Sequence, residues 1–335
     1  MQLPPTIELV GHLRALQEGI RSAVMGSRKS PVEDLAGVER SSASDTIYAI
    51  DALVEPVIEA YCERWGRETP MVVIAEGLEG KDGREVRVFP EGTPEGEAVI
   101  RVILDPIDGT RGIMYDKRPA WSLGAVAPNL GEGTRLRDCV AAVMTELPTS
   151  KMGFADVLWA TKGGGAHGVR AELGSGREKP LTLRPSRAED LAHGFAMVSH
   201  FFPATKIQAG ELMNHILRGI GFVDPTLATV FDDQYICTGG QFYCLAMGQD
   251  RFNADLRPLF YRRAGVPEGL ACHPYDCAGL LIAEEAGVVI TGADGKPLDA
   301  PLDTTSPVSW VGYANETLRQ KIQPLVESFF AGRHI

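Results

Sequence analysis

The sequence has little positive charge and no long apolar runs, which argues against a nucleic-acid-binding or a membrane protein. Its 335 residues include 33 Lys and Arg against 44 Asp and Glu, which gives a formal net charge of −11. This balance argues against nucleic acid and anionic membrane surfaces as partners. No apolar stretch approaches the length of a membrane span, and the first residues lack the basic and apolar regions of a signal peptide. We therefore expect a cytoplasmic protein that does not bind a membrane.

The cysteines lack the spacing of a metal or redox motif. None of the six belongs to a Cys-x-x-Cys pair, and Cys272, His273 and Cys277 have no second pair with which to complete a zinc site. We expect reduced and mostly buried thiols instead. No internal repeat is visible, so the length allows two subdomains or one large layered domain.

Apolar periodicity predicts a mixture of helices and strands. Helical spacing predicts helices at 6–25, from about 45 to 65, at 208–219 and at 276–286. Short apolar runs predict strands at 71–75, 100–104, 121–127, 140–146, 157–161 and 288–291. Residues 77–99 read as an exposed hairpin or flap, and residues 239–246 as either a helix or a strand. We predict an α+β chain of two subdomains, 1–185 and 186–335, because helix and strand alternate from about residue 185.

The segment 100–112 is the most informative part of the chain. The apolar run 100–104 ends abruptly at Asp105 and Asp108, and Gly109 and Thr110 follow at once. Two acids three residues apart repel each other, and a bound cation removes that repulsion. Accessible backbone N–H groups and a hydroxyl beside a metal could hold a phosphate and deliver a water to it. The alternative is a plain turn, since Asp-Pro and Asp-Gly are common turn dipeptides.

Two further acids stand where they could join this pair. Glu76 directly follows the strand 71–75, and ligands collect at the carboxyl ends of strands in α/β sheets. Asp276 begins the helix 276–286, where its carboxylate could cap the helix, bind a metal, or do both. Oxygen ligands of this kind suit Mg²⁺ or Mn²⁺ rather than zinc.

The run Gly163–Gly168 is a weak match to a dinucleotide-binding loop. No amphipathic helix follows it, so a hairpin turn explains it better than a nicotinamide site.

Four segments together resemble the inositol monophosphatase family of Mg²⁺-dependent, lithium-sensitive phosphatases, whose relatives act on fructose 1,6-bisphosphate and phosphoadenosine nucleotides. The run from Asp105 to Thr110 is similar to the first motif of that family. Pro274-Tyr275-Asp276-Cys277-Ala278-Gly279, followed by Glu285-Ala286-Gly287, is similar to the second. Glu76 and the segment Ser42-Ala43-Ser44-Asp45 resemble two further elements, and all four occur in the order of the family. The resemblance implies a layered αβαβα sandwich of the sugar-phosphatase type and a homodimer.

The resemblance also implies roles for particular residues. Glu76, Asp105 and the Ile107 carbonyl would hold one Mg²⁺, while Asp105, Asp108 and Asp276 would hold a second. A third, weaker ion would bind near Glu76, and Mn²⁺ could substitute for Mg²⁺. The nucleophilic water would be oriented by Thr110 with Asp45 behind it, and the N–H groups of Gly109 and Thr110 would hold the phosphate. Without the resemblance, Asp45 is equally a helix N-cap.

The sequence departs from the family pattern mainly on the substrate side. Arg111 follows Thr110, where a small polar residue is usual; it could bind a second anionic group on the substrate or pair with Asp116 or Glu79 at the surface. The inositol enzymes have an acid seven residues before the second-motif Asp, and that position here is Gly269. These differences put inositol itself in doubt.

The sequence therefore predicts a Mg²⁺-dependent phosphomonoesterase that hydrolyses a small phosphorylated metabolite, such as an inositol phosphate or a sugar phosphate. The alternatives are a fructose-1,6-bisphosphatase-like activity, a nucleotide 3′-phosphatase activity, or a catalytically silent relative that binds a phosphorylated ligand.

Overall fold

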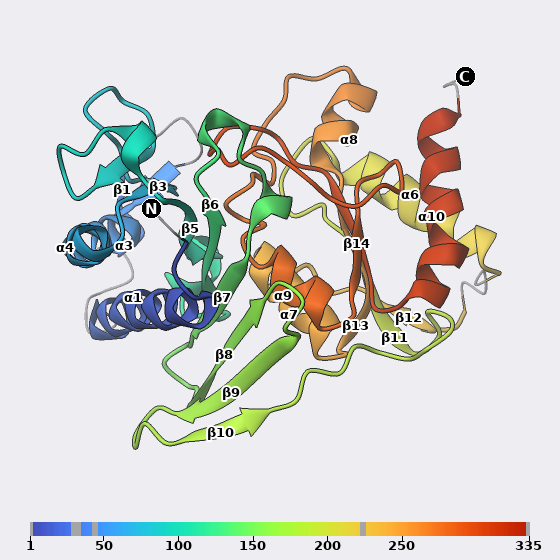
Figure 1. The fold of residues 1–335 in the computed structure, drawn as a ribbon. Coiled ribbons are helices and arrows are strands. Elements are labelled where there is room, and N and C mark those ends of the chain that lie inside the picture. The colour runs from blue at the N-terminus through green and yellow to red at the C-terminus, as the bar shows by residue number, and fades with distance from the viewer. Residues whose placement is uncertain (1–2, 28–34, 42–45, 222–225, 333–335) are drawn as a thin grey trace.

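The computed structural model describes residues 3–27, 35–41, 46–221 and 226–332, which form alternating layers of helix and sheet (Figure 1). The N-terminal layer consists of α1 (Thr6–Ser27) and α4 (Glu55–Glu68). Leu9, Leu13, Leu16 and Ile20 repeat at helical spacing along α1 and are fully buried. This apolar stripe holds α1 against the first sheet and beside α4.

The first sheet has eight strands and is mostly antiparallel. Its strands, in spatial order, are β10 (Glu178–Leu181), β9 (Ala166–Glu172), β8 (Phe154–Thr161), β7 (Ala141–Leu147), β6 (Ala120–Pro128), β5 (Ile100–Asp108), β3 (Met71–Ala75) and β4 (Val86–Phe89). Only β3 and β5 run parallel, with Ala75 opposite Leu104. The ends of these two strands therefore meet at the same edge of the sheet.

The second sheet has five strands and lies in the C-terminal part of the chain. Its strands, in spatial order, are β12 (Val230–Phe231), β11 (Gly194–Val198), β13 (Asp250–Asp255), β15 (Trp310–Tyr313) and β14 (Val289–Thr291). The pairs that include β11 are parallel, and those that include β15 are antiparallel.

Two helices fill the space between the sheets, and two more cover the outer face of the second sheet. Helix α7 (Thr238–Ala246) contacts β6 and β13, and α9 (Leu280–Glu285) contacts β8 and β14. On the outer face, α6 (Lys206–Gly219) contacts β11 and α10 (Glu316–Ala331) contacts β15. The order helix, sheet, helix, sheet, helix confirms the predicted αβαβα sandwich.

Most predicted elements are confirmed, with shifted ends. The second helix begins later than residue 45, because β2 (Thr46–Tyr48) pairs with β1 (Val38–Ser41) and the short α3 (Ala49–Ala52) precedes α4. Residues 239–246 belong to helix α7. The segment 77–99, expected to be an exposed hairpin or flap, contains β4, the edge strand beside β3, and Leu78, Glu85 and Phe89 within it are buried.

The proposed boundary between residues 185 and 186 stays a prediction. The first sheet ends at Leu181 and the second begins at Gly194, yet one apolar core contains residues of both sheets. Among the described helices, none combines the length and apolar content that crossing a membrane requires.

Candidate metal centre

A β-bulge at the end of β5 brings Asp105 and Asp108 to the same side of the strand. Asp105 lies opposite Leu123 on β6 and Asp108 lies opposite Trp121, so β5 contains one extra residue between them. In a regular strand, residues three apart point to opposite faces, and one inserted residue restores a common face. Pro106 lies in this bulge, where its missing N–H does not interrupt the ladder. The predicted turn at 105–108 is therefore a bulge within a longer strand.

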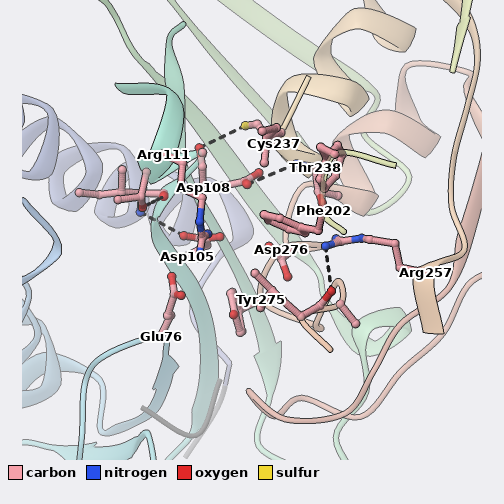
Figure 2. Close-up of a pocket in the computed structure, with 17 residues that line it drawn as sticks. Glu76, Asp105, Asp108, Arg111, Phe202, Cys237, Thr238, Arg257, Tyr275 and Asp276 are labelled. Carbon is pink, nitrogen blue, oxygen red and sulfur yellow. Dashed lines mark hydrogen bonds between the residues drawn. The ribbon is translucent and has the colours of Figure 1, made fainter. Parts of the chain in front are cut away.

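Asp105, Asp108 and Asp276 form the one cluster, within the described residues, that brings three or more possible ligand atoms close enough to share an ion. Each offers a carboxylate oxygen, and these oxygens lie within 4.8 Å of one another. Figure 2 shows the three side chains converging, with the Glu76 side chain next to Asp105. Glu76 lines the same cleft, as predicted from the parallel ends of β3 and β5.

Backbone amides hold each of the three aspartates in place. The N–H of Ile107 donates to Oδ1 of Asp105 at 3.0 Å, and the N–H of His273 donates to Oδ2 of Asp276 at 2.6 Å. Asp108 accepts from two amides in the first turn of α7: Thr238 at 3.3 Å and Gly239 at 2.5 Å. Each amide bond orients a carboxylate and leaves further lone pairs facing the others.

Gly239 is required for the close approach of α7 to Asp108. A Cβ at this position would lie 2.5 Å from Cδ2 of Leu123 and 3.1 Å from Oδ2 of Asp108. Gly109, directly after Asp108, has a φ of 96°, a left-handed conformation that favours glycine. The Asp-Gly pair thus bends the chain out of β5 and toward α7.

The acids destabilise one another when all are charged. Burial raises the pKa of Asp105 well above its usual range, and the charges of Glu76 and Asp108 raise it further. Burial raises the pKa of Asp108 to about 6, although the Gly239 amide favours the ionised form. The pKa of Asp276 is likewise raised by burial and by the charge of Asp108. This oxygen-rich donor set fits a hard divalent cation, which would relieve the repulsion.

Thr110 has a carboxylate partner, Asp51, that the sequence analysis did not name. Its hydroxyl lies 3.0 Å from Oδ1 of Asp51 and 2.8 Å from the carbonyl oxygen of Ile107. Asp45 lies outside the described residues, so its role stays a prediction. Asp51 belongs to α3, and its other oxygen accepts from the N–H of Tyr48 at 2.9 Å. The sequence reasoning missed Asp51 because it started the helix at Asp45, which left Asp51 as one acid within the helix.

Asp276 is not a helix cap. Helix α9 starts at Leu280 with Gly279 at its N-cap, and residues 274–279 form consecutive turns closed by bonds such as Cys277 N–H to Pro274 O at 3.1 Å. The predicted helix 276–286 is therefore too long at its start. These turns aim the Asp276 carboxylate at Asp105 and Asp108 instead of along α9.

Two arginines face the cleft opposite Glu76. Arg111 lies with its guanidinium over the rings of Tyr48 and Phe202, at 5.5 Å and 5.4 Å from the ring centroids. Arg257, the first residue of α8 (Arg257–Ala264), also lines the cleft. Gly269 lies in the exposed chain after α8 and does not line the cleft. The sequence analysis did not name Arg257, because no motif pointed to it.

Other expectations concern groups outside the cleft. Gly163–Gly165 form the turn between β8 and β9, and the amides of Gly163 and Gly165 donate to Glu285 at 2.6 Å and 2.8 Å. The hairpin interpretation is therefore confirmed.

Cys272 and Cys277 are buried free thiols, with their sulfur atoms 3.5 Å apart.

Solved structures share this fold at low sequence identity. A hypothetical protein from Pyrococcus horikoshii with similarities for inositol-1 monophosphatase is 15% identical, with a TM-score of 0.62 over 99% of this chain and 100% of that one. Leishmania major fructose-1,6-bisphosphatase is 14% identical, with a TM-score of 0.65 over 97% and 93%. An IMPase from Thermotoga maritima is 16% identical, with a TM-score of 0.60 over 97% and 98%.

No family model and no curated protein matches the sequence. The structural likeness nevertheless extends over nearly the whole of each chain. In fold, the chain is of the inositol monophosphatase and fructose-1,6-bisphosphatase type.

Proposed function

We propose that this protein is a Mg²⁺-dependent phosphomonoesterase that acts on a small phosphorylated metabolite. The observation that carries the proposal is the convergence of Asp105 and Asp108, from β5, with Asp276, from the turns before α9, beside the backbone of Gly109 and Thr110. The fold shared with inositol monophosphatase and fructose-1,6-bisphosphatase structures supports it. The cleft is small and polar, as a site for a phosphate ester needs to be.

Asp105, Asp108 and Asp276 would hold the cations, together with Glu76 and the Ile107 carbonyl. We propose two Mg²⁺ that share Asp105, with a third, weaker ion near Glu76, and Mn²⁺ as a substitute. Bound Mg²⁺ supplies a water of lowered pKa and a positive charge for the leaving oxygen.

The protein's own groups handle the proton and the phosphate. The Thr110 hydroxyl accepts a hydrogen bond from the attacking water and donates to Asp51, so the Asp51 carboxylate can take up the proton released. The N–H groups of Gly109 and Thr110 hold the phosphate oxygens in the position for in-line attack.

The test is phosphate release from a panel of inositol phosphates, sugar phosphates, sugar bisphosphates and nucleotide 3′-phosphates at millimolar Mg²⁺. We expect release from at least one class, and its loss on chelation. If no compound releases phosphate, the phosphatase proposal fails, and a silent relative that binds a phosphorylated ligand becomes the better interpretation.

Asp105→Asn is the matching variant. It removes the carboxylate common to both proposed ions, so phosphate release is expected to fall to background while circular dichroism is unchanged. Asp82→Asn, in an exposed loop, is the control and is expected to keep full activity. Turnover retained by Asp105→Asn contradicts the shared ligand.

A further inference from the structure

The wall of the cleft opposite Glu76 has an acid and an arginine whose positions are informative. Asp255 ends β13 and is fully buried, and it does not line the cleft. Arg257 is only 4% exposed and does line it. Asp255 is thus an internal partner of Arg257. The group that faces the cleft at this wall is the guanidinium of Arg257 (Figure 2).

The Arg257 guanidinium is held in one orientation. Nε lies 2.8 Å from Oδ1 of Asp255, Nη2 lies 2.6 Å from Oδ2, and Nη1 donates to the carbonyl of Leu270 at 3.0 Å. A guanidinium has five N–H donors, so two remain beyond these bonds with the described residues. Although burial by itself lowers it, the Asp255 carboxylate holds the pKa of Arg257 above its ordinary value. Arg257 is therefore a fixed, permanently charged donor.

Aromatic rings join Arg257 to Arg111. The Arg257 guanidinium lies over Phe201 and Phe202, at 4.7 Å and 5.2 Å from the ring centroids. The Arg111 guanidinium lies over the same Phe202 ring at 5.4 Å. Stacking on a ring orients a guanidinium and leaves its edge available for hydrogen bonds, and Arg257 has two donors left there. Two positive groups are thus concentrated at one wall of a cleft in a chain whose net charge is −11.

This charge exceeds what the reacting phosphate needs, because the proposed cations at the aspartates and the Gly109 and Thr110 amides would serve that group. A wall built for a neutral polyol would present acceptors for hydroxyl groups, whereas Arg257 presents only donors. We propose that Arg257, together with Arg111, binds a second anionic group on the substrate, a phosphate or a carboxylate. The substrate is then a phosphate ester that carries another oxyanion. This inference rests on the proposed function and narrows its substrate class.

The test compares esters that differ only in the second anion. One pair is 3-phosphoglycerate against glycerol 3-phosphate, which tests a carboxylate. The other is a sugar bisphosphate against the corresponding monophosphate, which tests a second phosphate. A charge-assisted hydrogen bond corresponds to about a ten- to hundredfold change in affinity. In at least one pair, the member with the second anionic group is therefore expected to have a kcat/KM higher by about that factor. Equal kcat/KM within both pairs would overturn the proposal.

Two variants assign the preference to the arginines. The double variant Asp255→Asn, Arg257→Gln removes both buried charges together. Removing only one would leave the other charge buried without a partner and would destabilise the fold. Arg111→Gln leaves that buried pair intact. Each is expected to reduce the preference for the second anion, mainly through KM, because the group is bound equally in substrate and transition state. Arg262→Gln, an exposed arginine of α8, is the matched control.

Binding without turnover separates this inference from the proposed function. Phosphonate analogues, in which CH₂ replaces the ester oxygen, give dissociation constants for both members of each pair. If no ester is hydrolysed, the proposed function fails, but a tighter phosphonate with the second anion still supports the arginine site. An unchanged preference in both variants overturns the assignment to Arg257 and Arg111. If the double variant loses kcat/KM equally for both members of a pair, Arg257 has only a structural role, and this result also overturns the proposal.

Discussion

Glu146 is a buried acid outside the metal centre whose ionisation should destabilise the protein. It belongs to β7, is 8% exposed, and accepts from the N–H of Asp156 at 2.9 Å. Asp156 itself is paired with Arg170, at 2.7 Å from Nε. Burial raises the pKa of Glu146 to about 7, and the Asp156 charge adds to this, while Arg170 and Arg21 oppose it.

The sign and size of the effect follow from this shift. Because the pKa is raised from 4.5 in the unfolded chain to about 7 in the fold, the folded state binds more protons between these values. Stability is therefore lost as pH rises through this window, and the loss is complete above pH 7. One pKa unit corresponds to about 1.4 kcal/mol, so ionised Glu146 costs about 3 kcal/mol. Glu146→Gln keeps an oxygen for the Asp156 N–H and removes the charge.

The assay is urea unfolding of wild type and Glu146→Gln at pH 4.5 and pH 8.5, at constant ionic strength and Mg²⁺. We expect similar free energies of unfolding at the lower pH and a gain of about 3 kcal/mol for the variant at the higher pH. Glu132→Gln, at an exposed position, controls for the loss of one negative charge. A difference between wild type and Glu146→Gln that does not change with pH would refute the reasoning.

Two further predictions concern the metal centre. Asp51→Asn is expected to lower kcat by about 10²-fold or more with little change in KM, since it removes the acceptor behind the Thr110 hydroxyl; steady-state kinetics that show an unchanged kcat exclude Asp51 from proton transfer. Gly239→Ala places a Cβ 2.5 Å from Cδ2 of Leu123, so overpacking is expected to cost about 1–3 kcal/mol of stability in thermal unfolding. The same variant should weaken Mg²⁺ binding in calorimetry by displacing the amide that Asp108 accepts from. An unchanged affinity argues that α7 does not position Asp108.

The fold and the three aspartates could be predicted from the sequence because their signals are local. The stripe of α1 repeats within one helix, and the apolar runs of β3 and β5 end at their acids. That β3 and β5 are parallel neighbours was a condition of the prediction, and the pairing of Ala75 with Leu104 meets it.

The contacts that the sequence did not reveal depend on distant segments or on small changes of register. The bulge in β5 is defined by its pairing with β6. No pattern within residues 100–108 predicts that pairing. Asp51 becomes the partner of Thr110 only because α3 lies against a residue 59 positions further along the chain. Arg257, two residues after the end of β13, lines the cleft and Gly269 does not, and no local pattern in the sequence distinguishes the two positions.

The arrangement of amide donors explains how one fold tolerates three buried acids and why we expect it to favour a cation over protons. Asp105 accepts from the N–H of Ile107, Asp276 from the N–H of His273, and Asp108 from the N–H groups of Thr238 and Gly239. A carboxylate has about four lone-pair sites, so most of the acceptors stay directed at the common centre. A proton can neutralise one carboxylate and bridge two oxygens, but it cannot serve three acids within 4.8 Å. A divalent cation can, because it accepts several oxygens at once. The amide hydrogen bonds that orient the three carboxylates thus define where the proposed cation would lie.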